Sequence, residues 1–362
     1  MLVVRGAVKD YDWGVVDGLA AWSGAATGAP QAELWFGVHP GGPSPLVDDA
    51  GAPTGEYLAD HFDVEHIPVL VKLLAAARPL SVQVHPTAAT ARRMWQAQQD
   101  GTGETVLTDP FEKTEMLVAL GPFEAFAGWR DVAQAAAILG RVSGCGDGVA
   151  ALERGDVKAA IVALLGTRDF AGAVAALPAA AAAAGLAGRE LDAYATVASR
   201  FPDDAGALLT PLLAFITLVE GEAAFVPAGV PHSYVRGTGL EVMTSSDNVL
   251  RMGLTPKAVF VGEALAALEL DRSPTVVRTA IGERVAPRGA PFAATLHRDA
   301  TVDMPAGRYR IVLLLEGEAR VSTSLGDIDL RCGTAAVLAA VDPSAVLMVT
   351  GLAAVVTAGQ ES

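Results

Sequence analysis

The chain has 362 residues, 51% of them hydrophobic and 19% charged, which excludes an intrinsically disordered protein and allows more than one buried core. With 26 Lys and Arg against 41 Asp and Glu, the net charge is −15, and so acidic a surface repels nucleic acid and anionic lipid. The two cysteines, Cys145 and Cys332, are too few for a disulfide framework or a thiolate zinc site.

Targeting signals are weak along the whole chain. A run of only four apolar residues precedes Arg5, which is too short for a signal-peptide core and predicts a cytoplasmic protein. Residues 170–188 and 343–360 carry no charge, but the first stretch is mostly Ala and Gly, and Pro and Gly interrupt the second. Because Ala and Gly supply little transfer free energy, we expect buried elements of a soluble protein rather than membrane spans.

The first 200 residues predict strands followed by helices. Residues 69–74 and 80–85 are rich in apolar and β-branched residues and are separated by an Arg-Pro break, so each predicts a strand. Residues 131–140 have an acidic start, a run of helix formers and a Gly stop, which predicts a helix. The Ala-rich segments that follow, to about residue 200, extend this into a helical block.

From Pro211 the pattern of strands returns. In a last block, from about Val276, short apolar runs alternate with Gly and Asp at regular spacing without helices between them, which predicts an antiparallel sandwich or jelly roll. Glu220-Gly-Glu and Glu316-Gly-Glu each separate two apolar runs. We interpret them as equivalent turns in a weak internal repeat of two β-barrels, although Glu-Gly turns are common enough for a chance match.

Two segments offer imidazoles with other metal ligands nearby. In Gln83-Val-His85-Pro, alternation along a strand places the amide and the imidazole on one face. In Pro-His232-Ser-Tyr, the histidine follows a turn that closes an apolar strand, where it can point into the mouth of a small barrel. Taken alone, the first segment is better explained by a solvent-facing polar strand, and the second equally well by a structural histidine.

Two further segments bring charges together. Lys113 and Glu115 are two residues apart before an apolar run, so both can face a barrel opening, although an exposed ion-paired edge explains them better in isolation. Arg251 and Lys257 lie in a polar stretch with Gly and Pro, which in an acidic protein suggests an anionic ligand. A surface turn is an equally good explanation of that stretch alone.

Taken together, these segments resemble the type I phosphomannose isomerases. The resemblance spans residues 11 to 257, and the Gln-Val-His-Pro and Asp-Asn-Val-x-Arg-x-Gly-x-Thr-Pro-Lys segments are its most specific parts. The matching stretches occur in the family's order and are 11–14, 32–40, 42–44, 68–72, 79–86, 113–116, 122–125, 227–234 and 246–257. The last hundred residues match only in general character.

The resemblance implies one zinc ion per chain, held by Gln83, His85, Glu115 and His232. This set of nitrogen and oxygen ligands suits Zn²⁺, although manganese, cobalt or iron could use the same ligands. The family often has Pro where this chain has Thr114, which leaves the ligand at Glu115 in place.

The other site residues are implied in the same way. The family's active-site arginine matches Arg251, and Glu241, Asp247 and Lys113 match residues lining the same pocket. Ser81 and Lys257, with Arg251, would hold the phosphate. The remaining histidines, at positions 39, 61, 66 and 297, lack a ligand-type context and are expected to be structural or at the surface.

The implied reaction interconverts mannose 6-phosphate and fructose 6-phosphate by moving a proton between C2 and C1 through an enediolate. Zn²⁺ and Arg251 would stabilise the developing oxygen charge. Glu241, Asp247 and Lys113 remain open as the group that takes and returns the proton. The implied setting is carbohydrate metabolism, including GDP-mannose biosynthesis, by a monomer that binds a small sugar phosphate and neither nucleic acid nor membrane.

The expected fold is mainly β with an inserted α-helical domain and two cupin-type jelly-roll barrels. A catalytic jelly roll would comprise residues 1–130 and 211–264, the helical domain 131–210, and a metal-free C-terminal jelly roll 265–362. Two other functions compete with the isomerase: a non-catalytic sugar-phosphate-binding cupin, and another cupin-type metalloenzyme such as an oxygenase. The complete ligand set argues against the first, and the Arg251–Lys257 segment against the second.

Overall fold

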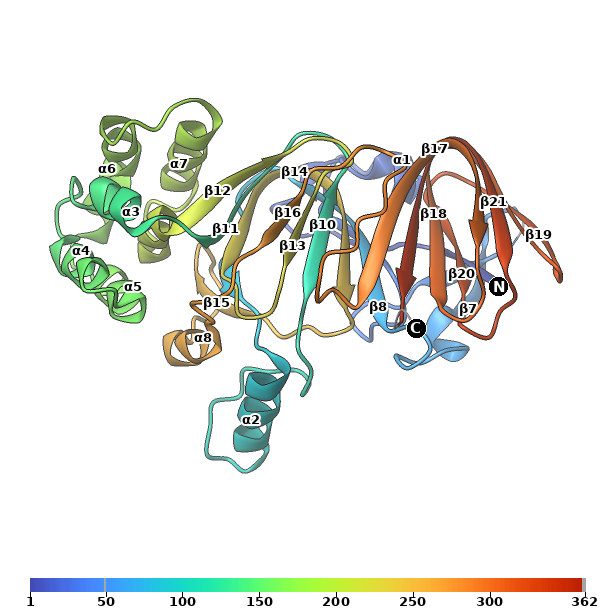
Figure 1. The fold of residues 1–362 in the computed structure, drawn as a ribbon, viewed down its shortest axis with the longest axis horizontal. Coiled ribbons are helices and arrows are strands. Elements are labelled where there is room, and N and C mark those ends of the chain that lie inside the picture. Colours follow the sequence, from blue (N-terminus) through green and yellow to red (C-terminus); the bar gives the residue numbers. More distant parts are fainter. Residues whose placement is uncertain (49, 360–362) are drawn as a thin grey trace.

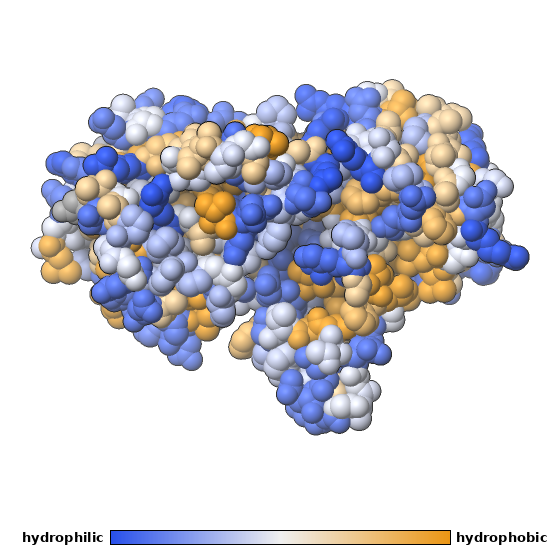
Figure 2. Space-filling view, turned by 180° about the vertical axis from the view of Figure 1, so that it is seen from behind, coloured by the Kyte–Doolittle hydropathy of each residue, from blue (hydrophilic) through white to orange (hydrophobic). Residues whose placement is uncertain are grey.

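The computed structural model describes residues 1–48 and 50–359, and the chain is mainly β. Two large sheets lie side by side along the molecule, a group of helices lies at one end, and α2 (Ala88–Gln99) projects from one side (Figure 1). Seen from behind, the surface is largely hydrophilic, with hydrophobic side chains gathered above this projection and over the helical end (Figure 2).

The larger sheet has eleven strands within the described residues, and its main path runs β16-β13-β10-β14-β8-β5-β2. The start of β14 pairs with β9 and β11, whereas its later part pairs with β8 and β10, so this one strand joins both regions of the sheet. The strands are β2 (Ala7–Lys9), β5 (Glu33–Phe36), β8 (Val69–Ala76), β9 (Val82–Val84), β10 (Glu115–Ala119), β11 (Phe123–Trp129), β12 (Leu213–Leu218), β13 (Ala223–Val226), β14 (His232–Thr244), β15 (Leu250–Gly253) and β16 (Thr275–Val277).

The smaller sheet has eight strands within the described residues and combines both ends of the chain. Its main path runs β17-β21-β18-β20-β1-β6-β7, and β19 pairs with β18. The N-terminal β1 lies antiparallel to β20, with Leu2 opposite Val337. The strands are β1 (Leu2–Arg5), β6 (Pro45–Val47), β7 (Pro53–Tyr57), β17 (Phe292–Met304), β18 (Tyr309–Thr323), β19 (Gly326–Leu330), β20 (Thr334–Leu338) and β21 (Ala345–Ala358).

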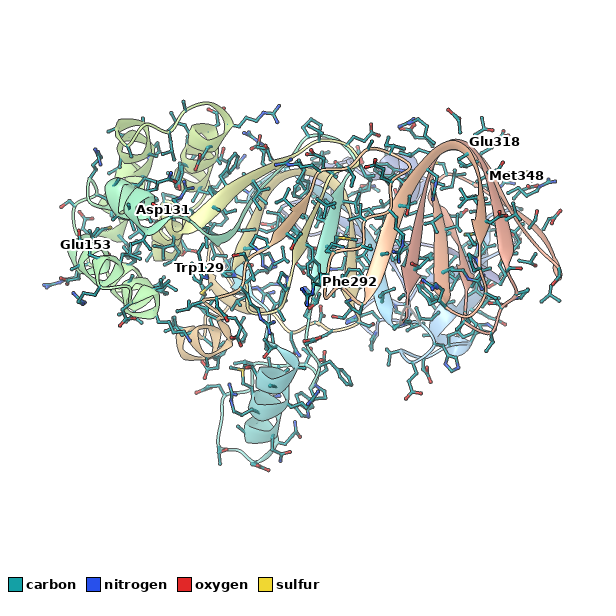
Figure 3. All side chains as sticks on the ribbon, viewed as in Figure 1. Trp129, Asp131, Glu153, Phe292, Glu318 and Met348 are labelled. Atoms are coloured by element: carbon teal, nitrogen blue, oxygen red, sulfur yellow. The ribbon has the colours of Figure 1, made fainter. Side chains whose placement is uncertain are left out.

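The helical block follows β11, and the chain enters it between Trp129 and Asp131 (Figure 3). Asp131, Asp156 and Asp169 each cap a helix by accepting a hydrogen bond from a backbone N–H three residues later. The block comprises α3 (Val132–Leu139), α4 (Gly146–Glu153), α5 (Val157–Leu165), α6 (Phe170–Ala183) and α7 (Gly188–Arg200). The other short elements are α1 (Ala20–Ser23), β3 (Val15–Val16), β4 (Pro30–Gln31), η1 (Leu58–Asp60), η2 (Ala205–Leu212) and α8 (Val261–Ala267).

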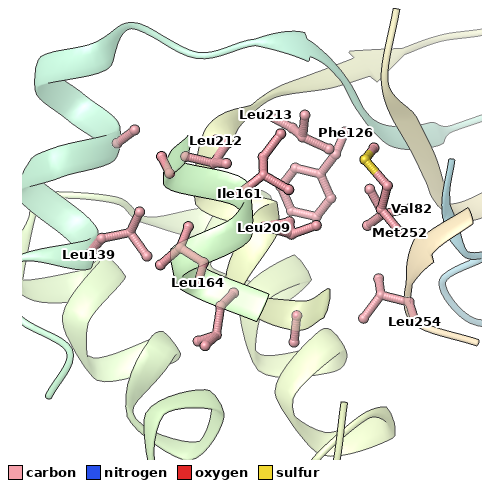
Figure 4. Packing of buried hydrophobic residues seen from close by; sticks show 14 of the residues in the cluster. Val82, Phe126, Leu139, Ile161, Leu164, Leu209, Leu212, Leu213, Met252 and Leu254 are labelled. Carbon is pink, nitrogen blue, oxygen red and sulfur yellow. The ribbon is translucent and has the colours of Figure 1, made fainter. Parts of the chain in front are cut away.

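Two apolar clusters hold these parts together. One fills the space between the sheets, with Val71 of β8 and Ile311 of β18 among its members. The other joins the helical block to the larger sheet, where Ile161 and Leu164 pack in the same cluster as Val82 of β9 (Figure 4). The second cluster fixes β9, the strand before His85, against the helices.

Most of the predicted elements are confirmed. The strands expected at 69–74 and 80–85 are β8 and β9, and the helix expected at 131–140 is α3 with Asp131 and Gly140 as its caps. The turn expected at Glu316-Gly-Glu is wrong, because these residues lie within β18 at a β-bulge. The extra residue of the bulge is Leu315, and Gly317 two residues later has φ +77°, a left-handed conformation that glycine adopts without strain inside a continuous strand.

The recorded pairings form open paths rather than a closed ring in the described part of the chain. The structure therefore establishes a mainly β protein, and the jelly-roll description and the domain boundaries stay predictions. Residue 264 falls inside α8, and β16 pairs with β13 of the larger sheet, so the end of the expected catalytic domain is not a clean break. Residues 360–362 of the expected C-terminal domain, and Gln360 of the uncharged stretch, lie outside the described residues.

No single helix among the described residues has both the length and the apolar character needed to cross a membrane. By length and composition alone, α5 and α6 reach that threshold as a pair, but they are bent by 120°.

Candidate active site

Alternation along three neighbouring strands points charged side chains to one face of the larger sheet. In β8, the residues on either side of Lys72 pack in the core between the sheets, so Lys72 points to the opposite face. Glu241 of β14 lies directly opposite Lys72 in the strand register. In β10, the residue after Glu115 packs between the sheets, so Glu115 shares the face of the other two.

The four predicted metal ligands come together at this face. Glu115 places Oε2 3.1 Å from His85 Nε2 and Oε1 2.8 Å from His232 Nε2. Gln83 Nε2 lies 3.1 Å from His232 Nε2. Potential ligand atoms of His85, Glu115 and His232 all lie within 4.8 Å of one another, and all three residues are buried. The solvent-facing alternative for the Gln-Val-His-Pro strand is therefore wrong for His85.

Both imidazoles are oriented by a hydrogen bond at the other ring nitrogen. His85 Nδ1 lies 2.8 Å from the carbonyl oxygen of Asn248, and His232 Nδ1 lies 3.2 Å from that of Val230. A carbonyl oxygen only accepts, so each Nδ1 donates, and Nε2, on the side of Glu115, is the ring nitrogen that remains for a metal ion.

The Gln83 amide is held by a hydroxyl from its own segment. Ser81 Oγ donates to Gln83 Oε1 at 3.1 Å, while the amide nitrogen faces His232. Turning the amide by 180° exchanges its oxygen and nitrogen in nearly the same space. Gln83 can thus present an oxygen to the cluster without any movement of the backbone.

Burial and neighbouring charges set the protonation of the cluster. Burial, with the positive charge of Lys113, lowers the pKa of His85 to about 4, so this imidazole is neutral near pH 7. Burial works to raise the pKa of Glu115, but Lys113 and the two histidines outweigh it and hold the pKa well below its usual range. Lys113 Nζ lies 3.3 Å from Glu115 Oε2, and both residues are buried, so the exposed-edge alternative for this pair is wrong.

A second group of buried charges lies beside the cluster, and the sequence analysis identified only its Glu241. Lys72 Nζ lies 3.0 Å from Glu241 Oε2 and 3.7 Å from Glu33 Oε1, and Trp35 Nε1 donates to Glu33 Oε2 at 2.7 Å. Burial raises the pKa of Glu241 despite the opposing charge of Lys72. Burial alone would lower the pKa of Lys72, but Glu241 and Glu33 raise it above its usual value. A lysine in the middle of an apolar strand was the signal in the sequence.

A cavity of about 300 Å³ opens above these groups and is lined by residues from several predicted segments. The predicted site residues that line it are Ser81, Gln83, Lys113, Glu115, Glu241, Asp247, Arg251 and Lys257. Arg251 of β15 lies opposite Gln83 in the strand register, and Lys257 lies over the ring of Tyr11 at 5.8 Å.

The cavity also has cations that the sequence analysis missed. Arg78 lies in the loop between β8 and β9, and Arg200 ends α7, so the helical block contributes to the cavity wall. With Lys72, Lys113, Arg251 and Lys257, they place six cationic side chains around one cavity in a protein of net charge −15, although Arg78 is paired with Asp12. This arrangement favours an anionic group as ligand.

Most of the other histidines lie away from this cavity, as expected. His61 and His66 are exposed and contact acidic side chains nearby, and His297 lies on β17 of the other sheet. His39 is buried beside Trp35, and its Nε2 lies 3.9 Å from Asp247 Oδ2 at the cavity wall.

Comparison with known proteins assigns the family. Residues 1–132 match the family model described as the catalytic domain of type I phosphomannose isomerase. The mannose-6-phosphate isomerase of Salmonella typhimurium is 31% identical over 92% of this chain and 93% of its own length. The chain belongs to the mannose-6-phosphate isomerase family. The Escherichia coli member is 29% identical over the same shares of the two chains.

Solved structures of the family agree with the fold. A mutant of phosphomannose isomerase from Salmonella typhimurium has a TM-score of 0.84 at 28% identity, covering 99% of this chain and 100% of that one. A mannose 6-phosphate isomerase bound with zinc and yttrium has a TM-score of 0.82, also at 28% identity and with the same coverage. This chain is therefore an isomerase of sugar phosphates, with a buried His-Glu-His cluster suited to a metal ion.

Proposed function

We propose that the protein interconverts mannose 6-phosphate and fructose 6-phosphate and uses one zinc ion per chain. The observation that carries the proposal is the position of the ligand cluster. Glu115 lines a cavity that also has cationic side chains in its wall, and His85 and His232, which do not line the cavity, converge on this carboxylate. A metal beside an anion-binding cavity suits a phosphorylated sugar with two reacting oxygens.

The donor set of the cluster fits zinc. Two imidazoles, a carboxylate and an amide oxygen supply four nitrogen and oxygen ligands, the number that zinc most often takes. The Nδ1 atoms of His85 and His232 are already bonded to carbonyl oxygens, which is the outer support that metal-bound histidines have in other proteins. Tyr234 adds to this support by donating from its hydroxyl to Glu115 Oε1 at 3.2 Å. When bound, zinc would act as a Lewis acid that polarises substrate oxygens.

The cationic wall of the cavity would bind and orient the substrate. Arg251 is partly buried, and its planar guanidinium suits the oxygen that gains charge in the enediolate. Lys257 and Ser81, with Arg78 and Arg200 at the rim, would hold the phosphate. The phosphate would thus lie toward the outer wall, and C1 and C2 toward the buried charges.

Among the three candidates for the proton-transferring group, we favour Glu241. Its carboxylate lines the cavity, and burial raises its pKa toward the range in which a general base works best. Lys113 is engaged with the ligand Glu115 and would serve as a cation that keeps this carboxylate ionised. Asp247 is exposed at the cavity wall, where it would contact the sugar hydroxyls rather than the buried reacting atoms.

We further propose that the architecture is that of two cupin-type jelly rolls with an inserted helical domain. The larger sheet, from residues 1–130 and 211–264, would be the catalytic jelly roll, residues 131–210 the insertion, and residues 265–362 most of the second jelly roll. The long antiparallel strands β14, β17, β18 and β21 support this reading. Because β1 pairs with β20, the second jelly roll would borrow an N-terminal strand.

One experiment tests the proposed function directly. Purified protein of measured zinc content is incubated with mannose 6-phosphate, and formation of fructose 6-phosphate is followed. The same sample is treated with a chelator and then supplied again with zinc. We expect conversion that tracks the zinc content. Conversion that is unchanged after complete zinc removal would contradict the zinc part, and absence of conversion by zinc-loaded protein would contradict the substrate.

A further inference from the structure

A single carboxylate outside the active-site cavity, that of Asp109, ties together two loops that carry site residues. Its Oδ1 accepts hydrogen bonds from Ser246 Oγ at 2.9 Å and from Asn248 Nδ2 at 3.0 Å. Its Oδ2 accepts from the backbone N–H of Asp247 at 3.3 Å. Asp109 thereby fixes three successive residues of the segment between β14 and β15.

Asn248 is the other half of this connection. The residue is fully buried, and its Nδ2 also reaches the carbonyl oxygens of Asp109 at 2.9 Å and Phe111 at 2.8 Å. Its Oδ1 accepts from the backbone N–H of Thr108 at 2.9 Å. The whole hydrogen-bonding capacity of the amide is therefore used on one loop, residues 108–111.

The connection between Asp109 and Asn248 reaches two residues of the site, His85 and Asp247. The backbone carbonyl of Asn248 accepts from His85 Nδ1 at 2.8 Å, so its position determines where the imidazole points. The preceding residue, Asp247, lines the cavity. Neither Asp109 nor Asn248 lines that cavity themselves, so their influence passes through His85 and Asp247.

We propose that Asp109 and Asn248 are positioning residues of the active site, which lock the orientation of the ligand His85 and the wall residue Asp247. The inference deepens the proposed metal site and rests on it. Without the Asp109–Asn248 connection, the segment 246–248 has lost the bonds that hold its backbone against the 108–111 loop. The Asn248 carbonyl then shifts, and His85 meets the metal with a poorer geometry.

The test compares zinc affinity with stability in matched variants. Asp109→Asn turns one of the two acceptor oxygens into an amide nitrogen, and Asn248→Ala removes the amide, so both weaken the connection, and Asp17→Asn is the control. Asp17 also braces a loop, accepting from the backbone N–H groups of Thr27 and Gly28, but lies in none of the cavities described. Zinc affinity is measured by competition with a chelating indicator, and the melting temperature is measured on metal-free protein. Loss of an outer support typically costs about 10–100-fold in metal affinity.

We expect that loss in both connection variants, together with a changed visible spectrum of the Co²⁺-loaded protein, and wild-type affinity in Asp17→Asn. Ser246→Ala removes a hydroxyl that donates to Asp109 and accepts from the backbone N–H of Asn248, but leaves the amide bonds of Asn248 in place. This variant serves if the stronger ones do not fold, and it should weaken zinc binding by a smaller factor. If the connection variants have a lowered melting temperature but a zinc affinity within about threefold of wild type, the positioning role is wrong, whereas the proposed metal site is unaffected. If the His85→Ala variant binds zinc as tightly as the unaltered protein, the proposed metal site is wrong, and this inference is wrong with it.

Discussion

The two sheets differ in what they bury on the face turned away from their shared core. In the larger sheet that face carries charged and polar groups, among them Lys72, Glu115 and Glu241, around a cavity. In the smaller sheet the corresponding face is filled by an apolar cluster that includes Val312 and Leu314 of β18. The difference shows that similar antiparallel sheets can be stabilised by apolar packing in one case and shaped for chemistry at a cost in stability in the other.

The two sheets also differ in the partners of a buried cationic side chain. Arg310 of β18 is fully buried and donates to the carbonyl oxygens of Met304, Ala339, Asp342 and Pro343. Its guanidinium thus holds the end of β17 and the segment after β20 in place. Lys72 of β8 contacts two carboxylates beside the cavity. A buried cation bonded to backbone carbonyls supports the fold, whereas one paired with carboxylates at a cavity sets their protonation.

Among the tests of this difference between the two sheets, removing the smaller sheet is expected to have the largest effect. A chain that ends at residue 278 keeps α8 and β16 but loses the strands β17 to β21. The apolar surface between the sheets and the edge of β1 would then be exposed, so we expect insoluble or aggregated protein. Solubility and zinc content on expression check this. A soluble, zinc-loaded but inactive truncation would show instead that the smaller sheet supplies a catalytic group.

The next largest difference is expected between histidine substitutions in the two sheets, because only the larger sheet would bind the metal. We expect His232→Ala, or chelation, to lower kcat more than about 10³-fold, because a Lewis acid contributes several kcal/mol. His297→Ala, which alters a histidine of the smaller sheet, is the matched control and should keep wild-type zinc content and kcat. Zinc analysis and kcat on the same samples provide the check, and equal zinc loss in both variants would contradict the assignment.

The raised pKa of Glu241 predicts a pH dependence. A general base acts in its ionised form, so kcat/KM should rise with pH through the pKa of Glu241, above the value of about 4.3 of an ordinary glutamate. Glu241→Gln should remove this rise and lower kcat by about 10²–10⁴-fold. Asp247→Asn is the comparison variant, and pH–rate profiles of both are the measurement. If the rise is lost in Asp247→Asn and kept in Glu241→Gln, Asp247 is the base.

Arg251 is expected to act mainly in the transition state. Arg251→Ala should lower kcat and kcat/KM together by about 10²–10³-fold with zinc content intact, and Arg251→Lys should rescue only in part because an ammonium lacks the planar fork. Saturation kinetics with zinc analysis checks this. A rise in KM with kcat within about threefold of wild type would indicate that Arg251 only holds the phosphate.

The smallest effect on catalysis is expected at Arg310. Arg310→Met leaves buried carbonyl oxygens without a donor, so the free energy of unfolding should fall by about 2–4 kcal/mol. Because Arg310 lies in the smaller sheet, KM and kcat should stay at wild-type values while the protein is folded. Urea denaturation and kinetics measured below the unfolding transition test both parts, and a kinetic change without loss of stability would contradict the structural role.

Local patterns predicted many of the elements, and one prediction failed because a strand pairing outweighed the local preference. Asp131 and Gly140 marked the ends of α3 because capping preferences depend on a few adjacent residues. Glu316-Gly-Glu was expected to be a turn, yet it continues β18, because pairing with β21 on one side outweighs the turn preference of a glycine. The same tripeptide preference is satisfied at Glu220, where no strand continues through it.

The sequence by itself was enough to propose the ligand set, since Gln83, His85, Glu115 and His232 stand in segments whose order resembles one family. It also determined that a cation-rich segment with Arg251 follows them. Only the tertiary structure decided that Lys72, Glu33, Arg78 and Arg200 join the same site and that Asp109 braces it from outside. Strand alternation gives the face of a residue, but which faces meet depends on pairings between residues more than a hundred positions apart, such as Lys72 with Glu241, and no local pattern encodes them.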